Sequence, residues 1–200
     1  MSGLRVAVLV SGGGSNLQSI IDATERLYLK SKIVCVISNK EDAYGLERAR
    51  QHKIEGIYID PKQEAYDHRL LTLLQEKEID LIVLAGYLKI ISPSMIKAFP
   101  GQIINIHPSL LPKYGGQGYY GIHVHKAVIA AGEKYSGATV HQVDDGIDTG
   151  HTILQKSIPV LAEDTPETLQ QRILEEVEHK ILVEAILMIE ENPNIIKHTR

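Results

Sequence analysis

The segment LRVAVLVSGGGSNLQSII (residues 4–21) is the part of the sequence that says most about the fold. Residues 4–10 form an aliphatic run interrupted only by Arg5, which is typical of a strand buried on both faces. A glycine turn follows, and residues 15–28 carry a helical pattern in which Ser15 and Asn16 are both suitable N-caps. A strand that leads through a glycine turn into a helix predicts an α/β protein.

The same alternation continues outward along the chain. It predicts strands at 33–38, 56–60, 80–85 and 102–106, with helices at 15–28, 43–52, 66–78 and 93–99. Beyond residue 106 it predicts a helix at 123–131, strands at 138–143 and 152–160 joined by a hairpin, and one helix at 164–190 that Thr165 and Thr168 cap. The expected fold is a Rossmann-like, mostly parallel sheet with a C-terminal antiparallel hairpin and a long C-terminal helix.

Composition narrows the class of protein. The 200 residues suit one domain, and 21 Lys and Arg against 25 Asp and Glu give a net charge of -4. We therefore expect no nucleic-acid or membrane partner, since either needs a basic field or a long apolar segment. Cys35 is the only cysteine, so disulfides are excluded and the cytoplasm is the expected compartment. A monomer and a homodimer are both compatible with the sequence.

The loop at 11–16 indicates an anion site. Backbone N–H groups at a glycine turn and a helix N-terminus together favour a phosphate. A dinucleotide fingerprint would need glycine where Leu17 stands, and no Gly-Lys-Ser/Thr follows as in a P-loop. A small phosphomonoester site remains, and the alternative is a tight turn that binds nothing.

Asn105 and His107 form the second candidate site. Their i, i+2 spacing at the end of a strand points both side chains the same way, so an amide and an imidazole could serve one oxyanion. Three acids in the hairpin at 144–150 could partner the histidine, namely Asp144, Asp145 and Asp148. Without these neighbours, a histidine before proline is more often structural. Metal is not expected, because neighbouring histidines lack metal-ligand spacing.

Four segments together resemble the glycinamide-ribonucleotide branch of the folate-dependent formyltransferase family. They are SGGGSNLQ (11–18), LAGYLKIIS (84–92), NIHPSLLP (105–112) and GATVHQV (137–143) followed by DTG (148–150). The resemblance implies a formyltransferase fold and transfer of formyl from 10-formyltetrahydrofolate, as cosubstrate, to the amine of the ribonucleotide. It implies a single formyltransferase domain over 1–200, with a phosphate-binding half (1–100) and a catalytic and folate-binding half (101–200).

The resemblance also implies a role for each matching residue. Asn105 and His107 would stabilise the oxyanion, with His107 as proton donor and Asp148 holding it charged. A pKa above ~6.5 is therefore expected for His107. The ribonucleotide would contact Gly14, Ser15, Asn16, Gly86 and Glu178. The folate would contact Leu88, Lys89, Ile90, Ile91 and Asn105.

This chain departs from the family pattern in three places. Gln63, preceded by Lys62, stands where an arginine often holds the folate. The loop at 113–125 is about five residues longer than the common form and rich in Gly and Tyr, which fits either a lid or a mere insertion. Lys89 replaces a usual arginine.

Three other functions compete with this interpretation. A 10-formyltetrahydrofolate hydrolase shares the Asn, His and Asp, but we would expect a regulatory domain before the first strand. A methionyl-tRNA formyltransferase would add a C-terminal tRNA-binding domain. A phosphosugar-binding module without turnover would not need Asn105, His107 and Asp148 together.

Overall fold

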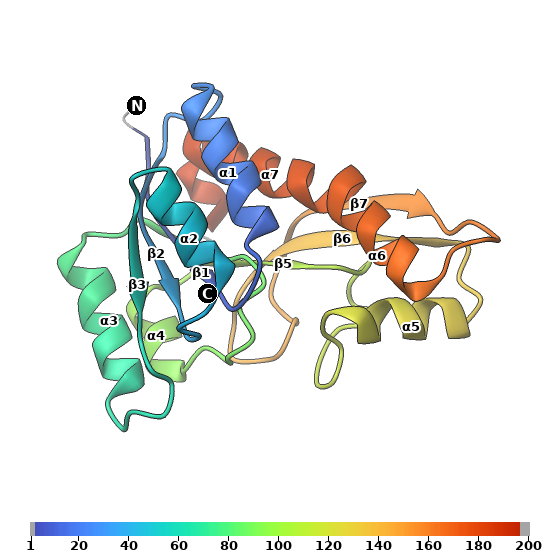
Figure 1. Cartoon of the computed structure of the whole chain (residues 1–200), viewed down its shortest axis with the longest axis horizontal. Helices are drawn as coiled ribbons and strands as arrows, with labels where there is room; N and C mark the ends of the chain where they lie inside the picture. Colours follow the sequence, from blue (N-terminus) through green and yellow to red (C-terminus); the bar gives the residue numbers. More distant parts are fainter. Residues whose placement is uncertain (1–2, 197–200) are drawn as a thin grey trace.

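A seven-stranded sheet forms the centre of the computed structural model, which describes residues 3–196. The strand order is β3-β2-β1-β4-β5-β6-β7; the pairs from β3 to β5 are parallel, and β6 and β7 are antiparallel (Figure 1). The strands are β1 (Arg5–Val10), β2 (Lys32–Ser38), β3 (Glu55–Tyr58), β4 (Leu81–Leu84), β5 (Ile103–His107), β6 (Tyr135–Gln142) and β7 (Thr152–Pro159). This arrangement confirms the predicted fold class.

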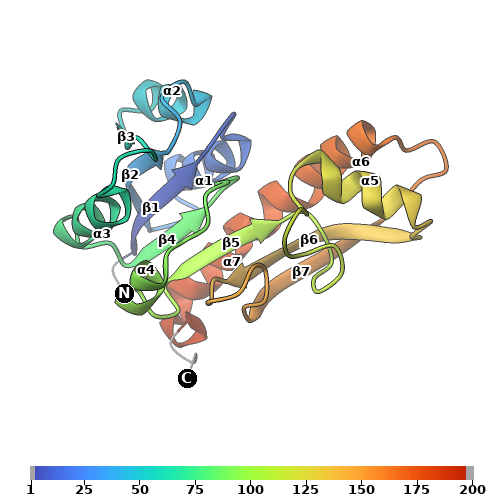
Figure 2. The same cartoon turned by 90° about the horizontal axis from the view of Figure 1, so that it is seen from below.

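Helices cover the sheet in two groups. The helical segments are α1 (Ser15–Glu25), α2 (Tyr44–Gln51), α3 (Tyr66–Glu76), α4 (Pro93–Ala98), α5 (Ile122–Ala130), α6 (Pro166–Ile173), α7 (His179–Glu191) and a final 3-10 turn, η2 (Pro193–Ile196). One core joins the sheet to α1, α2, α5, α6 and α7, and a second core joins it to α3 and α4. Figure 2 shows β6 and β7 extending away from the parallel strands, with α5 and α6 at their far end.

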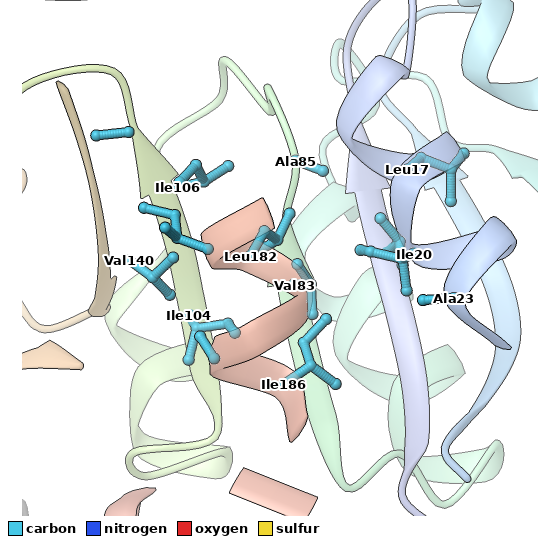
Figure 3. Close-up of a cluster of buried hydrophobic side chains, with 14 of the residues drawn as sticks. Leu17, Ile20, Ala23, Val83, Ala85, Ile104, Ile106, Val140, Leu182 and Ile186 are labelled. Carbon is cyan, nitrogen blue, oxygen red and sulfur yellow. The ribbon is translucent and has the colours of Figure 1, made fainter. Parts of the chain in front are cut away.

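Strand β1 shows why the aliphatic run folds this way. Alternate side chains point to opposite faces of a strand, so Val6, Val8 and Val10 enter the first core. Ala7 and Leu9 enter the second core. In the first core, side chains of α1 and α7 meet those of β4 and β5, among them Leu17, Ile20, Val83, Ile104, Leu182 and Ile186 (Figure 3).

Two local predictions are wrong. Helix α1 has Gly14 as its N-cap, with φ of 69° and no side-chain cap, so neither Ser15 nor Asn16 caps it. The predicted helix at 164–190 is divided by a π-helical turn, η1 (Leu174–Glu178), between α6 and α7. The Thr165–Thr168 capping box at its start is present as predicted.

The strand order places the site. Strands β2 and β3 lie on one side of β1, and the strands from β4 onward lie on its other side, so the strand order reverses between β1 and β4. Ligands of open α/β sheets bind beyond the carboxyl ends of the strands at such a switch point. The loops that follow β1, β4 and β5 all leave from this edge. Between residues 3 and 196, none of the helices is long and apolar enough for a bilayer crossing.

Candidate active site

The glycine loop after β1 lies against the loop after β4. Ser11 N donates to Gly86 O (3.1 Å), and the Ser11 hydroxyl accepts from Leu88 N (2.9 Å). Position 14 requires glycine, because its φ is 69° and a Cβ there would lie 2.9 Å from Gly45 Cα. Gly12 and Gly13 are exposed, with open space on the Cβ side. The structure thus brings Gly14, Ser15 and Gly86 together at one edge of the sheet, next to the exposed backbone of Gly12 and Gly13.

Glu178 reaches the same loop from the far end of the sequence. It ends the π turn and accepts a 2.7 Å hydrogen bond from Asn16 Nδ2. Burial raises the pKa of Glu178 to about 7, and the Asn16 hydrogen bond opposes that rise. The side-chain amide oxygen of Asn16, Oδ1, is buried and has no hydrogen-bond partner among residues 3–196. A π turn inserted in a helix often marks a functional position.

Asn105 and His107 lie on β5, as their spacing predicts, and His107 is 4% exposed. His107 Nε2 is 2.7 Å from the carbonyl oxygen of Tyr114, which accepts a hydrogen bond from it. His107 Nδ1 faces Asp148 Oδ2 at 3.5 Å. Both neighbours are acceptors, and the contact to Tyr114 is the shorter one. In the neutral imidazole we therefore place the proton on Nε2, and the unprotonated Nδ1 faces the acid.

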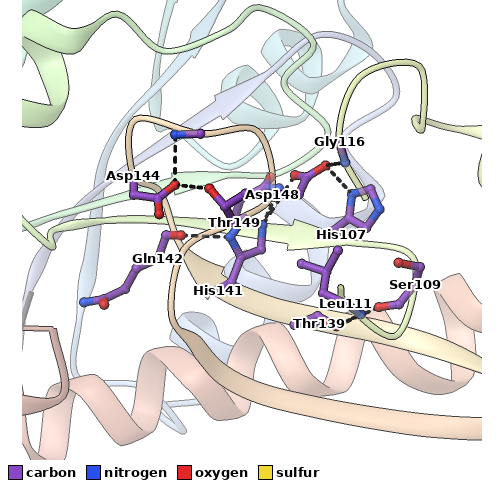
Figure 4. Close-up of polar contacts among 12 residues, drawn as sticks. His107, Ser109, Leu111, Gly116, Thr139, His141, Gln142, Asp144, Asp148 and Thr149 are labelled. Atoms are coloured by element: carbon purple, nitrogen blue, oxygen red, sulfur yellow. Dashed lines mark hydrogen bonds and ion pairs between the residues drawn. The ribbon is translucent and has the colours of Figure 1, made fainter. Parts of the chain in front are cut away.

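His141 links Asn105 to Asp148. Its Nδ1 donates to Gln142 O (2.8 Å), so its Nε2 can accept from Asn105 Nδ2 at 3.1 Å. The same Nε2 lies 3.6 Å from Asp148 Oδ1. Figure 4 shows Asp148 between the two imidazoles, with the Gly116 amide bound to its carboxylate. The structure thereby selects Asp148 from the three candidate acids as the neighbour of His107.

The expected rise in the pKa of His107 is wrong for this structure. Burial lowers the pKa, and it outweighs the opposing effects of the Asp148 carboxylate and the Tyr114 carbonyl. For Asp148, burial would raise the pKa, but the two imidazoles and the Gly116 amide lower it overall. His107 is therefore neutral near pH 7 here, beside an ionised Asp148.

Sequence reasoning missed the part that the loop between β5 and α5 plays. Tyr114 supplies the carbonyl that orients His107, and Gly116 N donates to Asp148 Oδ2 at 3.0 Å. Thr139 fixes the start of the loop, since its hydroxyl donates to Ser109 O (2.6 Å) and accepts from Leu111 N (3.2 Å). The run of glycines marked the loop, but local sequence does not encode these distant contacts.

The segment expected to hold folate follows Gly86. Leu88 is 57% exposed and Ile90 is 72% exposed, so both offer apolar surface. Ile91, in contrast, packs in the second core, which leaves only its backbone for a ligand. Lys89 Nζ lies 4.9 Å from the centroid of the Tyr66 ring. Among residues 3–196, no hydrogen bond joins these side chains to Asn105, His107 or Asp148.

Two other expectations concern cofactors and the missing arginine. Gln63 Oε1 accepts from Arg69 (3.3 Å) on the surface, and the backbone N–H of Lys62 donates to Asp60 Oδ1 (3.0 Å). Over the part of the chain that the structure describes, no three His, Cys, Asp or Glu residues form a group that could hold a metal ion.

Comparison with known proteins identifies the family of this chain. The family model for formyl transferase matches residues 4–186, and the chain belongs to that family. It is 45% identical over 186 residues to the chloroplastic phosphoribosylglycinamide formyltransferase of Vigna unguiculata, covering 91% of this chain and 59% of that protein. The chain thus spans about three fifths of the length of this plant relative.

A bacterial relative and a solved structure match over more of their length. The phosphoribosylglycinamide formyltransferase of Haemophilus influenzae is 44% identical, covering 86% of this chain and 81% of that protein. Glycinamide ribonucleotide transformylase 1 from Symbiobacterium toebii has a TM-score of 0.88 and 42% identity, covering 94% of this chain and 88% of that one.

Proposed function

We propose that this chain transfers the formyl group of 10-formyltetrahydrofolate to the amine of N1-(5-phosphoribosyl)glycinamide, a step of purine biosynthesis. The observation that carries the proposal is the pairing, at one sheet edge, of an anion-binding loop with an Asn105–His107–Asp148 cluster. Similarity to proteins named for this reaction supports the choice of substrates.

The chemistry begins with attack by the substrate amine on the formyl carbon. A C–N bond forms and the carbonyl electrons move to oxygen, giving a tetrahedral oxyanion. Asn105 and His107 hydrogen-bond that oxygen, which in other enzymes contributes about 10²–10³ in turnover per donor. Collapse of the intermediate breaks the bond to N10 of the folate, and N10 takes a proton as the attacking amine loses one.

His107 relays that proton through Nδ1: the unprotonated Nδ1 of the neutral imidazole takes it from the attacking amine, and the imidazolium then gives it to N10. The Tyr114 carbonyl holds Nε2, so Nδ1 is the nitrogen free to exchange a proton with the reacting atoms. Burial keeps the imidazole neutral at rest, and a developing oxyanion beside it would raise its pKa at the moment the proton is needed. Asp148, 3.5 Å from Nδ1, stabilises the resulting imidazolium.

Binding residues divide between the two loops at the sheet edge. Gly14, Ser15 and Asn16 hold the phosphate with backbone N–H groups at the start of α1. Glu178 and Gly86 contact the rest of the ribonucleotide. Leu88 and Ile90 cover the folate with exposed apolar side chains, while Lys89, Ile91 and Asn105 contribute polar or backbone groups. No resident metal or prosthetic group takes part in this scheme.

The domain assignment follows the same division. We assign one formyltransferase domain to residues 1–200, with phosphate binding in 1–100 and catalysis and folate binding in 101–200. Both substrates are small molecules. The cytoplasmic assignment remains a prediction from composition.

One assay tests the reaction against its competitors. The protein is incubated with 10-formyltetrahydrofolate, with and without the ribonucleotide, while folate absorbance is followed. We expect deformylation only when the ribonucleotide is present. Deformylation that ignores it would establish a hydrolase instead, and ribonucleotide binding without turnover would establish a phosphosugar-binding module.

A further inference from the structure

We propose that Arg48 is the positioning residue of the phosphate site: it holds the glycine loop (residues 11–16) in its anion-binding shape and supplies positive charge beside it. The inference rests on the proposed function, because it takes the phosphate of the ribonucleotide as the ligand. Arg48 lies on α2 and belongs to none of the motifs from which the site was predicted. The loop itself contains no charged side chain.

Helix α2 holds two consecutive carbonyl groups of the loop. Gly45 N donates to Gly12 O at 3.0 Å, and Arg48 Nε donates to Gly13 O at 2.8 Å. In a trans peptide the C=O and the following N–H point in opposite directions. The N–H groups of Gly13 and Gly14 are therefore turned away from α2. Consecutive N–H groups aimed to one side form a nest for an anion.

Arg48 is itself fixed in place. Its Nη1 donates to Gln18 Oε1 at 2.9 Å, and its guanidinium lies 5.0 Å from the centroid of the Tyr44 ring. Its Cδ is 3.5 Å from the position that a Cβ on Gly14 would occupy. Within residues 3–196 Nη2 makes no hydrogen bond and no carboxylate forms an ion pair with Arg48, so its positive charge is not neutralised beside the loop.

An independent observation points to a ligand at the same loop. Asn16 is 7% exposed, its Nδ2 is engaged by Glu178, and its buried Oδ1 has no partner among the described residues. A buried acceptor without a partner is costly, and a hydroxyl donor from a ligand would satisfy it. A phosphate on the glycine loop with a hydroxyl near Asn16 is the pattern that a sugar phosphate presents.

The test compares Arg48→Ala and Arg48→Lys with Arg50→Ala. Arg50 is a matched control on the same helix, paired with Glu47 on the surface and 74% exposed. Steady-state kinetics should show the KM for the ribonucleotide raised about 10–100-fold in Arg48→Ala, the range for one lost charged hydrogen bond, with kcat and the folate KM within about twofold. Arg48→Lys keeps the charge but not the fork, so a rise of about three- to tenfold is expected.

Thermal shift with inorganic phosphate gives a readout besides turnover. Phosphate should raise the Tm of the wild type and of Arg50→Ala, and should not raise that of Arg48→Ala. An unchanged ribonucleotide KM in both Arg48 variants would overturn the proposal. So would a fall in kcat and Tm without a KM change, which would make Arg48 only structural. If Arg48→Ala does not fold, Arg48→Lys decides.

Failure of the proposed function is a different result. In that case the wild type would neither bind the ribonucleotide nor turn it over, whatever the residue at position 48. Wild-type turnover with an Arg48→Ala variant that behaves like Arg50→Ala would reject only the role of Arg48.

Discussion

The two glycine-rich loops of this molecule make an instructive pair. The first, at 11–16, is short and joins a strand to a helix, so its exposed glycines can be predicted from its own sequence. The second, at 113–121, joins β5 to α5 and has three glycines with positive φ: Gly116, Gly118 and Gly121. It contacts His107 and Asp148 through backbone groups at Tyr114 and Gly116.

The two loops differ in how much of their role can be read from local sequence. The anion site proposed for the first loop follows from the position of the loop between β1 and α1, which can be read locally. The second acts at a distance, since it reaches a histidine on β5 and an acid in the β6–β7 connection. One loop should therefore govern binding and the other turnover, and variants of each can separate the two.

The largest expected effect is on turnover from the second region. His107→Ala removes the oxyanion donor and proton donor together, and kcat should fall by about 10²–10⁴-fold. Ribonucleotide binding should survive, because no contact joins His107 to loop 11–16. Calorimetric titration measures the affinity of the variant for the ribonucleotide. His123→Ala, an exposed residue on α5, is the matched control and should keep its activity. Loss of ribonucleotide binding in His107→Ala would show that binding and turnover do not belong to separate regions.

The next effect is on binding through the first loop. Gly14→Ala places a Cβ 2.9 Å from Gly45 Cα at a φ of 69°, so the loop must move. We expect about 2–3 kcal/mol lower stability and a ribonucleotide KM raised about 10–100-fold. Gly12→Ala, which meets open space, is the control. Equal KM values for the two variants would mean that loop shape does not matter.

A smaller effect should follow from Gly116→Ala. Gly116 has a φ of 90° and donates to Asp148, whereas Gly118 has a φ of 89° and makes no such contact. Each alanine costs about 1–3 kcal/mol of backbone strain, but only the first displaces the carboxylate. Steady-state kinetics should show kcat about tenfold lower in Gly116→Ala and within about threefold in Gly118→Ala. A Gly118→Ala variant as slow as Gly116→Ala would show that loop strain, and not the Asp148 contact, matters.

These particulars show how far sequence reasoning extends. The run at 4–10 and the spacing of Asn105 and His107 predicted a buried parallel strand and a shared face, because alternation along a strand is local. The neutral state of His107 could not be predicted, since it depends on burial by a loop that folds back seven residues later. The π turn that ends at Glu178 was also missed, because helical periodicity in the sequence does not distinguish one π turn from the α-helix around it.

The smallest effect concerns Glu178, whose pKa burial raises from 4.5 to about 7. Between those values the folded protein binds a proton that the unfolded chain has lost, so stability falls as pH rises from about 4.5 to 7. Glu178→Gln keeps the shape without the charge. Its Tm should exceed that of the wild type at pH 8 by a few degrees, and the difference should vanish at pH 4.5.

The control for this variant is Glu176→Gln, an exposed position in the same π turn, which should leave the pH profile of Tm unchanged. Because the Asn16 amide donates to Glu178, ionisation of this acid should change the hydrogen bonding of the loop at 11–16, although the two residues are 162 positions apart in sequence. Ribonucleotide affinity in Glu178→Gln should therefore lose part of its pH dependence between 5 and 8. If Tm and affinity both keep their wild-type pH profiles, Glu178 does not titrate in this range, and the first loop is governed by its backbone and Arg48 alone.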